Sequence, residues 1–371
     1  MNDRQFRIAI QQRVLPAYRV PFFDMLADTF HGNVSVFYGL PRSHEMLNTN
    51  LVPSCARSFR GRNLHLFSSR LYLCWQAGLM RWLRDWEPQV LVMEANPRYP
   101  HSIHAIRWMK RNDRKVIGWG LGSPYPQGVL AGLRIHQRRS FILNFDALIT
   151  YSQQGAEQYA KLGFPEERIF IAPNAVAGKP TLAPPQRPLR YAFNQPQVLF
   201  VGRLQERKKV DLLIKASALI PDDLKPQLHI VGDGPARNDL LQLAEATYPA
   251  VKFYGAVHGS DLAALFQKAD LFVLPGTGGL AVQEAMSFAL PVIVGEADGT
   301  QSDLVRPGNG WVLKNSTAEE LAGIMTDALK DIPQLRKMGA TSFDIVKSEV
   351  NLENMVAAFK GAIDAVRKEN Q

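Results

Sequence analysis

Short apolar runs of four or five residues recur along this 371-residue chain and alternate with segments that have helical periodicity. Runs that are apolar at every position are typical of strands buried on both faces of a parallel sheet. Strands separated by helices predict doubly wound α/β sheets. In the first half we expect strands at residues 6–10, 34–37, 89–93, 115–119, 147–150 and 168–171.

A proline-rich stretch divides this pattern in two. Residues 179–188 show no periodicity, so we expect a linker over residues 176–195 between a first domain, 1–175, and a second, 196–350. Two doubly wound sheets in series predict a ligand in the cleft between them, at the carboxyl ends of the strands. In the second domain we expect strands at residues 198–201, 227–231, 251–254, 271–274 and 291–294.

Composition and cysteine usage exclude several classes of protein. No apolar run is long enough to span a bilayer, and the first residues lead into a strand without the pattern of a signal peptide. Cys55 and Cys74 are the only cysteines, so the sequence predicts neither a disulfide framework nor a cysteine metal site. We therefore expect a reducing, cytoplasmic location.

Positive charge gathers in the first half of the chain. Residues 1–180 contain 23 Lys and Arg against 12 Asp and Glu, a net charge of +11, whereas the remainder has a net charge of −2. Nucleic acid and an anionic membrane face are the generic partners of such a region. Nucleic-acid binding would leave the glycine loops of the second half unused, so we favour the membrane. Residues 75–86 mix tryptophans and arginines at helical spacing, which fits an interfacial helix or a core-facing stripe with solvated arginines.

One loop of the second half has the pattern of a ligand site. The apolar run ending at Leu274 is followed by Gly276, Gly278 and Gly279 and then by a short helix. Glycines let a ligand approach the backbone closely, and the start of a helix offers N–H groups to a phosphate or a sugar. Glu284 follows about one turn into the helix, where its carboxylate can accept two hydroxyl hydrogen bonds. The alternative is an ordinary strand–turn–helix crossover with a solvated glutamate.

Two further glycine loops follow predicted strands. The first loop, residues 202–208, has the sequence Gly-Arg-Leu-Gln-Glu-Arg-Lys. Arg203 can bind a diphosphate through two parallel N–H groups and Lys208 through its single charged amine. The alternative is a solvated basic turn. Residues 232–235, Gly-Asp-Gly-Pro, admit a base or phosphate to the backbone, or form a simple turn. Neither matches a Walker A loop or a dinucleotide fingerprint.

The order of these motifs resembles the nucleotide-sugar domain of family 4 retaining glycosyltransferases, which have the GT-B fold. Gly-Arg-Leu with a lysine five residues after the arginine, Val-Gly-Asp-Gly-Pro, Ala-Asp-Leu-Phe-Val-Leu-Pro, Gly-Leu-x-x-x-Glu-Ala-Met and Pro-Val-Ile follow one another within residues 165–315. Residues 16–23, Pro-Ala-Tyr-Arg-Val-Pro-Phe-Phe, look like the opening of members that assemble bacterial surface polysaccharides. The fold implied is α/β GT-B, two doubly wound Rossmann-like domains facing each other across a cleft.

The resemblance implies a role for each loop. Glu284 would hold the two ribose hydroxyls, and Arg203 and Lys208 would bind the donor diphosphate and stabilise it as it leaves. Members of the family need no metal, because the basic side chains offset the leaving charge, and no cofactor is implied. A terminal helix within residues 351–371 would cross back onto the first domain. The expected donor-binding residues are Gly202, Arg203, Lys208, Gly232, Asp233, Gly234, Gly276, Thr277, Gly278, Gly279, Leu280 and Glu284.

Two positions depart from the family pattern. The family usually has a glutamate, in contact with the donor sugar, eight residues before the ribose-binding one, and this chain has Gly276 there. Many members carry a histidine near the end of a strand like residues 115–120, but Trp119-Gly-Leu-Gly-Ser-Pro-Tyr125 contains none. Both departures concern the sugar end of the site, so the donor sugar stays open while nucleotide-sugar binding is expected.

The acceptor is expected on the first domain. Glu94 ends a predicted strand and so points into the cleft, where it touches the acceptor or serves as a structural carboxylate. His101 and His104 can share a helix face but have no third ligand, so no metal site is predicted. The acceptor residues we expect are Glu94, Trp119, Gly120 and Tyr125.

These features predict a retaining, metal-independent hexosyltransferase that uses a UDP- or GDP-sugar. The expected acceptor is a lipid-linked glycan of polysaccharide biosynthesis, with the protein peripheral on the cytoplasmic membrane face. Two alternatives stay open. The same fold could act on a soluble small-molecule or protein acceptor, or the protein could bind a nucleotide sugar without transferring it.

Overall fold

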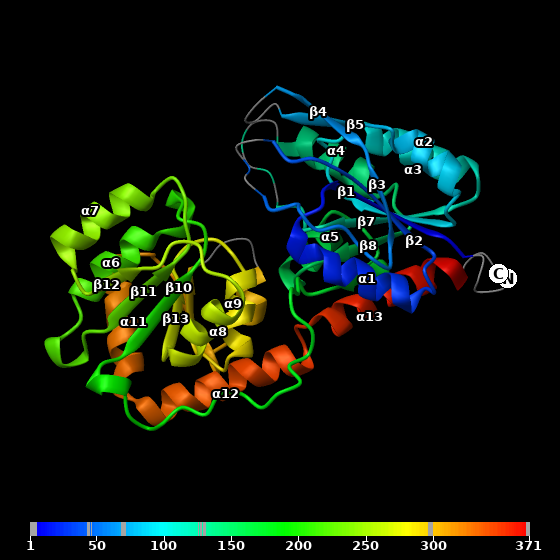
Figure 1. The fold of residues 1–371 in the computed structure, drawn as a ribbon. Coiled ribbons are helices and arrows are strands. Elements are labelled where there is room, and N and C mark those ends of the chain that lie inside the picture. The colour runs from blue at the N-terminus through cyan, green and yellow to red at the C-terminus, as the bar shows by residue number, and fades with distance from the viewer. Residues whose placement is uncertain are drawn as a thin grey trace. The chain divides into compact units, whose positions relative to one another are not determined.

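Figure 1 shows the fold in a computed structural model of the chain. The structure describes residues 6–368 apart from 43, 44, 46, 68–71, 125, 127, 129, 130 and 296–299. It divides into two compact units. Unit 1 comprises Met1–Val176 and Leu352–Gln371, and unit 2 comprises Ala177–Asn351.

Unit 1 is built on a seven-stranded parallel sheet with the strand order β3-β2-β1-β6-β7-β8-β9. Its central strands are buried along most of their length, as the apolar runs predict, whereas the edge strand β3 is exposed at every residue and has no apolar pattern. The strands are β1 (Ile8–Val14), β2 (Val34–Gly39), β3 (Arg57–Arg60), β6 (Val90–Glu94), β7 (Lys115–Gly120), β8 (Ala147–Thr150) and β9 (Ile169–Ile171).

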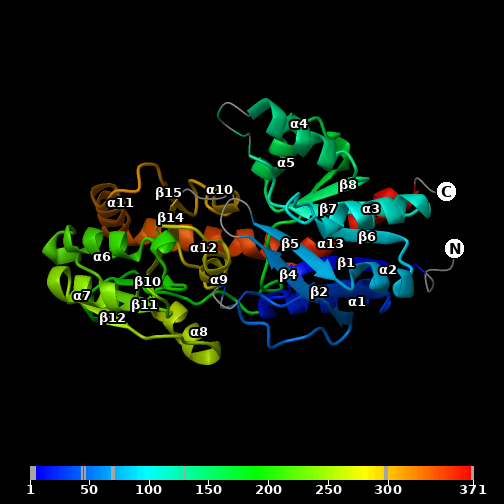
Figure 2. The same cartoon turned by 90° about the horizontal axis from the view of Figure 1, so that it is seen from above.

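Helices cover both faces of this sheet. On one face α1 (Val20–Thr29) packs beside the C-terminal helix α13 (Leu352–Lys368), as Figures 1 and 2 both show. Phe359 of α13 is fully buried, and its ring centroid lies 4.8 Å from those of both Phe22 and Trp119. The last helix therefore completes the core of the first unit. The other face carries α2 (Leu79–Trp86), α3 (His101–Arg111), α4 (Ala131–Ile142) and α5 (Gln153–Lys161).

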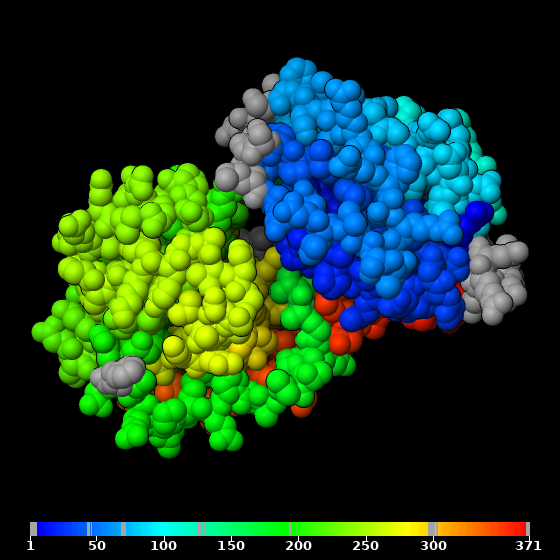
Figure 3. Space-filling view, viewed as in Figure 1, coloured from blue at the N-terminus to red at the C-terminus, as the bar shows by residue number. Residues whose placement is uncertain are grey.

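A short antiparallel pair, β4 (Arg62–Leu66) and β5 (Leu73–Ala77), lies outside the main sheet, on the light-blue surface of unit 1 in Figure 3. The helical reading of residues 75–86 is therefore wrong at its start. Gly78 has a φ of +95°, which turns the chain between β5 and α2. Within α2 the tryptophans are buried and the arginines are exposed, so the tryptophans form a stripe that faces the core and the arginines face solvent.

Unit 2 repeats the doubly wound plan with the strand order β12-β11-β10-β13-β14-β15, all parallel. Its strands are β10 (Gln197–Val201), β11 (Gln227–Val231), β12 (Val251–Phe253), β13 (Leu271–Leu274), β14 (Val292–Gly295) and β15 (Gly310–Leu313). Its helices are α6 (Val210–Ala218), α7 (Arg237–Thr247), α8 (Gly259–Lys268), α9 (Leu280–Ser287), α10 (Thr300–Leu304), α11 (Ala318–Lys330) and α12 (Ile332–Ser348).

Short 3-10 turns link several of these elements. They are η2 (Ala17–Arg19), η5 (Glu166–Arg168), η6 (Ala192–Asn194), η7 (Glu206–Lys208) and η8 (Asp222–Leu224). No helix in the described residues is both long and apolar enough to cross a bilayer.

In each unit the strand order reverses at one place, between β1 and β6 in unit 1 and between β10 and β13 in unit 2. Connections leave these neighbouring strands in opposite directions, which opens a crevice at their carboxyl ends where ligands bind in doubly wound folds. The two Rossmann-like domains of the predicted GT-B fold are confirmed.

Candidate functional site

Two of the predicted loops meet at the reversal point of unit 2. The β10 loop (residues 202–209) and the β13 loop (residues 275–279) follow the two strands that diverge there. Thr277 N donates a hydrogen bond to Arg207 O at 3.0 Å, and Arg207 Nη1 donates to Thr277 Oγ1 at 2.8 Å. Lys208 Nζ donates to Thr277 O. The basic residues of one loop therefore hold the backbone of the other.

The glycines of the β13 loop are required by this packing. A Cβ atom at Gly276 would lie 2.1 Å from Arg207 O and 2.6 Å from Lys208 C, both of them backbone atoms. Gly278 has a φ of +140°, and a Cβ there would lie 2.4 Å from Lys208 Nζ. The glutamate that the family usually has at the position of Gly276 does not fit this backbone.

The third predicted loop, the β11 loop (residues 232–236), packs against the β10 loop on its other side. Leu204 N donates to Asp233 O at 3.0 Å, and Ala236 N donates to Leu204 O at 3.1 Å. A Cβ at Gly232, whose φ is +137°, would lie 1.9 Å from Gly202 O, and one at Gly234 would lie 2.3 Å from Leu204 O. The structure thus brings the three glycine loops together into one packed surface.

Glu284 lies in α9, one turn after the helix begins at Leu280. No side chain caps this helix at Gly279, so its first N–H groups are available to a ligand. Burial raises the pKa of the half-buried Glu284 carboxyl, and the nearby His258 opposes that rise. In the described part of the chain no group donates a hydrogen bond to this carboxylate. It is a desolvated acceptor with unused capacity, which a diol can fill.

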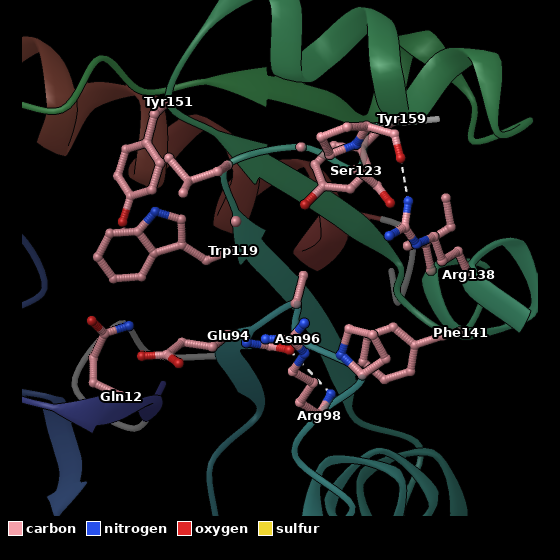
Figure 4. A pocket seen from close by; sticks show the side chains of 17 residues that line it. Gln12, Glu94, Asn96, Arg98, Trp119, Ser123, Arg138, Phe141, Tyr151 and Tyr159 are labelled. Carbon is pink, nitrogen blue, oxygen red and sulfur yellow. Dashed lines mark hydrogen bonds between the residues drawn. The ribbon is translucent and has the colours of Figure 1, made fainter. Parts of the chain in front are cut away.

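Unit 1 has a pocket of about 410 Å³ at the carboxyl ends of its central strands, shown in Figure 4. The predicted residues Glu94, Trp119 and Gly120 line it, and Tyr125 lies outside the described residues. The lining also includes Gln12, Ala95, Asn96, Pro97, Arg98, Leu121, Gly122, Ser123, Pro124, Arg138, Phe141, Ile142, Tyr151 and Tyr159.

Backbone and side-chain groups hold Glu94 in place at the end of β6. Its Oε1 accepts a hydrogen bond from Arg13 N at 2.8 Å, and its own N–H donates to Gln11 Oε1 at 3.0 Å. Gln11 is fully buried and donates in turn to Gln76 Oε1 at 2.5 Å. Burial raises the pKa of the Glu94 carboxyl, against the stabilising effect of Arg13 and Tyr99. This carboxyl is therefore a positioned group that can take up or share a proton.

Aromatic side chains form a wall of the pocket. The ring centroids of Trp119 and Tyr151 lie 5.6 Å apart. Behind them the buried guanidinium of Arg19 lies 5.2 Å from the Trp119 ring centroid and donates to Asn174 Oδ1 at 2.8 Å. At Gly120 a Cβ would lie 2.6 Å from the Tyr159 hydroxyl, so only glycine fits there. The wall is closely packed around Trp119.

Several residues of these sites escape sequence reasoning. Arg207 lies next to Lys208 in a basic run, but nothing in the run tells which member reaches the β13 loop. Gln12 had a usable signal, because it is one of the two amides that directly continue the apolar start of β1. Arg98 and Arg138 are forty residues apart, and only the fold brings them to one pocket.

The two histidines of α3 differ in their surroundings, because His101 is buried and His104 is exposed. His101 is buried on α3, its Nδ1 accepts a hydrogen bond from Gln76 N at 3.2 Å, and burial lowers its pKa to about 4. Among the described residues no group of three or more His, Cys, Asp and Glu is arranged to hold a metal ion.

Comparison with known proteins finds relatives of the loop-bearing domain. Residues 188–343 match the family model described as glycosyl transferases group 1. A GDP-mannose-dependent alpha-mannosyltransferase of Mycolicibacterium smegmatis is 43% identical over 116 residues, which cover 30% of this chain and 28% of that protein. A D-inositol 3-phosphate glycosyltransferase of Geodermatophilus obscurus is 25% identical over 327 residues, 80% of this chain and 67% of that protein.

The similarity in fold extends further than the similarity in sequence. The crystal structure of Anabaena Alr3699/HepE in complex with UDP matches with a TM-score of 0.74 and 16% identity, covering 97% of this chain and 100% of that one. By contrast, the matches to five of the curated relatives span only 20–35% of those proteins. Residues 188–343 are therefore similar to group 1 glycosyl transferases, and the chain as a whole has the GT-B fold.

Proposed function

We propose that this protein is a retaining glycosyltransferase that takes a sugar from a nucleotide-diphosphate donor bound to unit 2. One observation carries the proposal. Three glycine loops pack together at the reversal point of the unit 2 sheet, and α9, the helix that contains Glu284, follows one of them, all within the domain that matches the group 1 model. A doubly wound sheet binds nucleotides at such a point.

Each part of the donor has a suitable partner. Glu284 accepts hydrogen bonds from the two ribose hydroxyls, because its carboxylate is desolvated and has acceptor capacity to spare. Arg203 and Lys208 bind the diphosphate, together with the first N–H groups of α9. The base is uracil or guanine, since HepE was solved with UDP and the Mycolicibacterium smegmatis relative is named for GDP-mannose.

The reaction follows from the charge that develops on the donor. An acceptor hydroxyl oxygen attacks the anomeric carbon from the face that the diphosphate leaves, and the bond from that carbon to the phosphate oxygen breaks. The nucleoside diphosphate departs with the electron pair, and a phosphate oxygen takes the proton of the hydroxyl. Arg203 and Lys208 stabilise the growing negative charge in the way that a metal does in other transferases.

Unit 1 supplies the acceptor site and the location of the enzyme. Its pocket presents Glu94 to an acceptor hydroxyl beside an aromatic wall. The net charge of +11 in residues 1–180 suits an anionic membrane face. We therefore place the enzyme at the periphery of the cytoplasmic membrane, acting on a lipid-linked glycan in polysaccharide biosynthesis.

A second candidate function is nucleotide-sugar binding without transfer. Gly276 has no room for a side chain that would contact the donor sugar, and the segment after β7 has no histidine. Both features favour a site that makes more contacts with the nucleotide than with the sugar.

A donor panel separates these functions. A UDP- or GDP-sugar present at 100 times its dissociation constant should stabilise the protein by about 2.7 kcal/mol in a thermal-shift assay. The donor that binds should then be hydrolysed slowly without acceptor, and a chelator should leave that rate unchanged. Binding without any hydrolysis or transfer would support the second candidate, and an absolute requirement for Mg²⁺ or Mn²⁺ would refute the role of Arg203 and Lys208.

A further inference from the structure

Two arginines and several aromatic residues line the pocket of unit 1, which is large enough for a sugar. We propose that this pocket binds a phosphorylated sugar and that Arg98 and Arg138 bind its phosphate. This inference rests on the proposed function, because it names the chemistry of the acceptor that the same pocket would hold.

The charged groups of the pocket are spread over its walls. Figure 4 shows Glu94 and Gln12 on one side, Arg138 and Phe141 on the opposite side, and Arg98 between them. A ligand that fills this space therefore meets a carboxyl group at one end and guanidinium groups along the rest of its length.

Local hydrogen bonds fix the segments that carry both arginines. Arg138 projects from α4, and its Nη1 donates to the carbonyl oxygen of Pro124. Arg98 lies in the turn after β6, where its backbone N–H donates to Asn96 Oδ1 at 3.0 Å. Two separate elements therefore direct positive charge into one pocket, and neither arginine depends on the other for its position.

Neither guanidinium has a carboxylate partner in the part of the chain that the structure describes. Other arginines of unit 1 do, such as Arg13 with Glu45 at 3.0 Å and Arg7 with Glu87 at 3.2 Å. Glu94 is the one acidic side chain in the described lining, and Arg13 N already occupies one of its oxygens. The pocket thus has surplus positive charge, which an anionic ligand would balance.

The arrangement favours a phosphate over a carboxylate. A single arginine can saturate a carboxylate through its two parallel N–H groups. A tetrahedral phosphate keeps further oxygens for a second guanidinium that approaches from another direction. Arg98 and Arg138 come from different elements, so they suit the larger anion.

The rest of the lining suits a sugar ring. Trp119, Tyr151 and Phe141 contribute aromatic carbon to the lining against which its C–H groups can pack, and Gln12, Asn96 and Glu94 offer hydrogen bonds to its hydroxyls. The volume of about 410 Å³ lies near the lower end of the range of about 300–1,000 Å³ that is usual for ligand pockets. A short acceptor fits this space better than a long glycan.

Direct titration tests the inference without any turnover. The 1-phosphates of glucose, galactose and mannose, the three free sugars and inorganic phosphate are titrated by calorimetry into the full-length protein. At least one sugar phosphate should bind at least tenfold tighter than its free sugar. Arg98→Ala and Arg138→Ala should remove this tenfold advantage and leave the affinity for the free sugar unchanged, while Arg138→Lys should restore part of it.

Arg134→Ala is the matched control, since Arg134 is an exposed arginine one turn earlier on α4 and does not line the pocket. Equal affinity for sugar and sugar phosphate in the wild type, or equal losses for both ligands in Arg138→Ala, would overturn the inference. So would a failure of all the phosphates to bind while UDP or GDP still binds. Loss of nucleotide-sugar binding itself would instead count against the proposed function.

A second arm identifies the source of the phosphate. The best sugar 1-phosphate is compared with the same sugar linked through phosphate to a short prenyl chain in detergent micelles. Tighter binding of the prenyl form would indicate a lipid-carried acceptor, and tighter binding of the soluble form would indicate a free sugar phosphate.

Discussion

We propose that Glu284 binds the ribose of the donor and that Arg203 and Lys208 bind its diphosphate. The charge of these two parts of the donor changes differently during the reaction. The ribose keeps its charge from ground state to transition state, so a contact to it contributes equally to both. The diphosphate gains negative charge as the sugar leaves, so a cation beside it contributes more in the transition state. Substitutions of these residues should therefore change different kinetic constants.

Glu284→Ala should raise the donor KM and leave kcat close to the wild-type value. A lost hydrogen bond to a charged group costs about 1.5–3 kcal/mol, so KM should rise by at least one order of magnitude. Because burial raises the pKa of Glu284, the carboxylate takes up a proton at a higher pH than an exposed glutamate, and the wild-type KM should rise as the pH falls. Donor titrations decide this, with the exposed Glu245→Ala as control. An unchanged KM in folded Glu284→Ala would refute the ribose role.

Arg203→Ala and Lys208→Ala should instead lower kcat more than they raise KM. Removal of one donor to a developing charge typically costs about 10²–10³ in kcat. Lys208→Ala should have a further effect, because its Nζ also holds the carbonyl of Thr277 in the β13 loop. Steady-state kinetics measure these effects. Lys347→Ala is the control, because Lys347 is an exposed lysine of α12 and its loss removes a charge away from the site. A pure KM effect in both variants would contradict the proposed stabilisation of the leaving group.

At the scale of elements, the β13 loop needs glycine at position 276, because there is no room there for a side chain. Gly276→Ala should destabilise unit 2 and weaken donor binding, because the new Cβ would lie 2.1 Å from Arg207 O and the β10 and β13 loops would have to separate. Gly323→Ala is a sharp control. Gly323 lies exposed in α11 with no atom within 4 Å of a new Cβ, so this change should stabilise by about 0.5–1 kcal/mol. Thermal unfolding and donor binding measure both variants. A Gly276→Ala protein as stable as the wild type would show that the loops can separate freely.

The elements differ in how far the sequence predicts them. The strands β10, β13 and β14 were predictable, because each is a compact apolar run beside a glycine or proline. The strands β3 and β4 were not, because β3 (Arg-Ser-Phe-Arg) and β4 (Arg-Asn-Leu-His-Leu) contain no apolar run and neither strand is buried. The glycine loops of unit 2 could be placed at strand ends, and their order pointed to a nucleotide sugar. The contact between Thr277 and Arg207 could not be predicted, since it joins residues 70 positions apart through the packing of two strands.

At the scale of the whole molecule, unit 1 is assembled from both ends of the chain. Phe359 of α13 is fully buried against Phe22 and Trp119, so the last helix of the chain is part of the core that covers the first sheet. Phe359→Ala should lower the free energy of unfolding by about 3–5 kcal/mol. Chemical denaturation followed by tryptophan fluorescence measures this, and Phe288→Ala at a half-buried position of unit 2 should cost less. Equal costs for the two variants would argue against a core role of α13.

The positive charge of the molecule is concentrated in residues 1–180, and some of its basic side chains are exposed to solvent, where a membrane can contact them. Arg57, Arg60 and Arg62 are exposed on β3 and β4, near the exposed Leu64 and Phe67. Basic residues near an anionic bilayer contribute about 1 kcal/mol each, and salt screens the attraction. The protein should therefore bind phosphatidylglycerol vesicles, and raising the salt concentration should release it.

Replacing all three arginines with alanine should weaken vesicle binding by about two orders of magnitude, at about 1 kcal/mol for each charge. Removing the same charge from unit 2, by replacing the exposed Lys330, Lys337 and Lys347, should have little effect if the positive first half makes the contact. Vesicle co-sedimentation at several salt concentrations distinguishes the two variants. Equal binding to neutral and anionic vesicles, or equal losses in both triple variants, would show that this surface does not direct the protein to a membrane. The protein would then be expected to meet the proposed acceptor in solution.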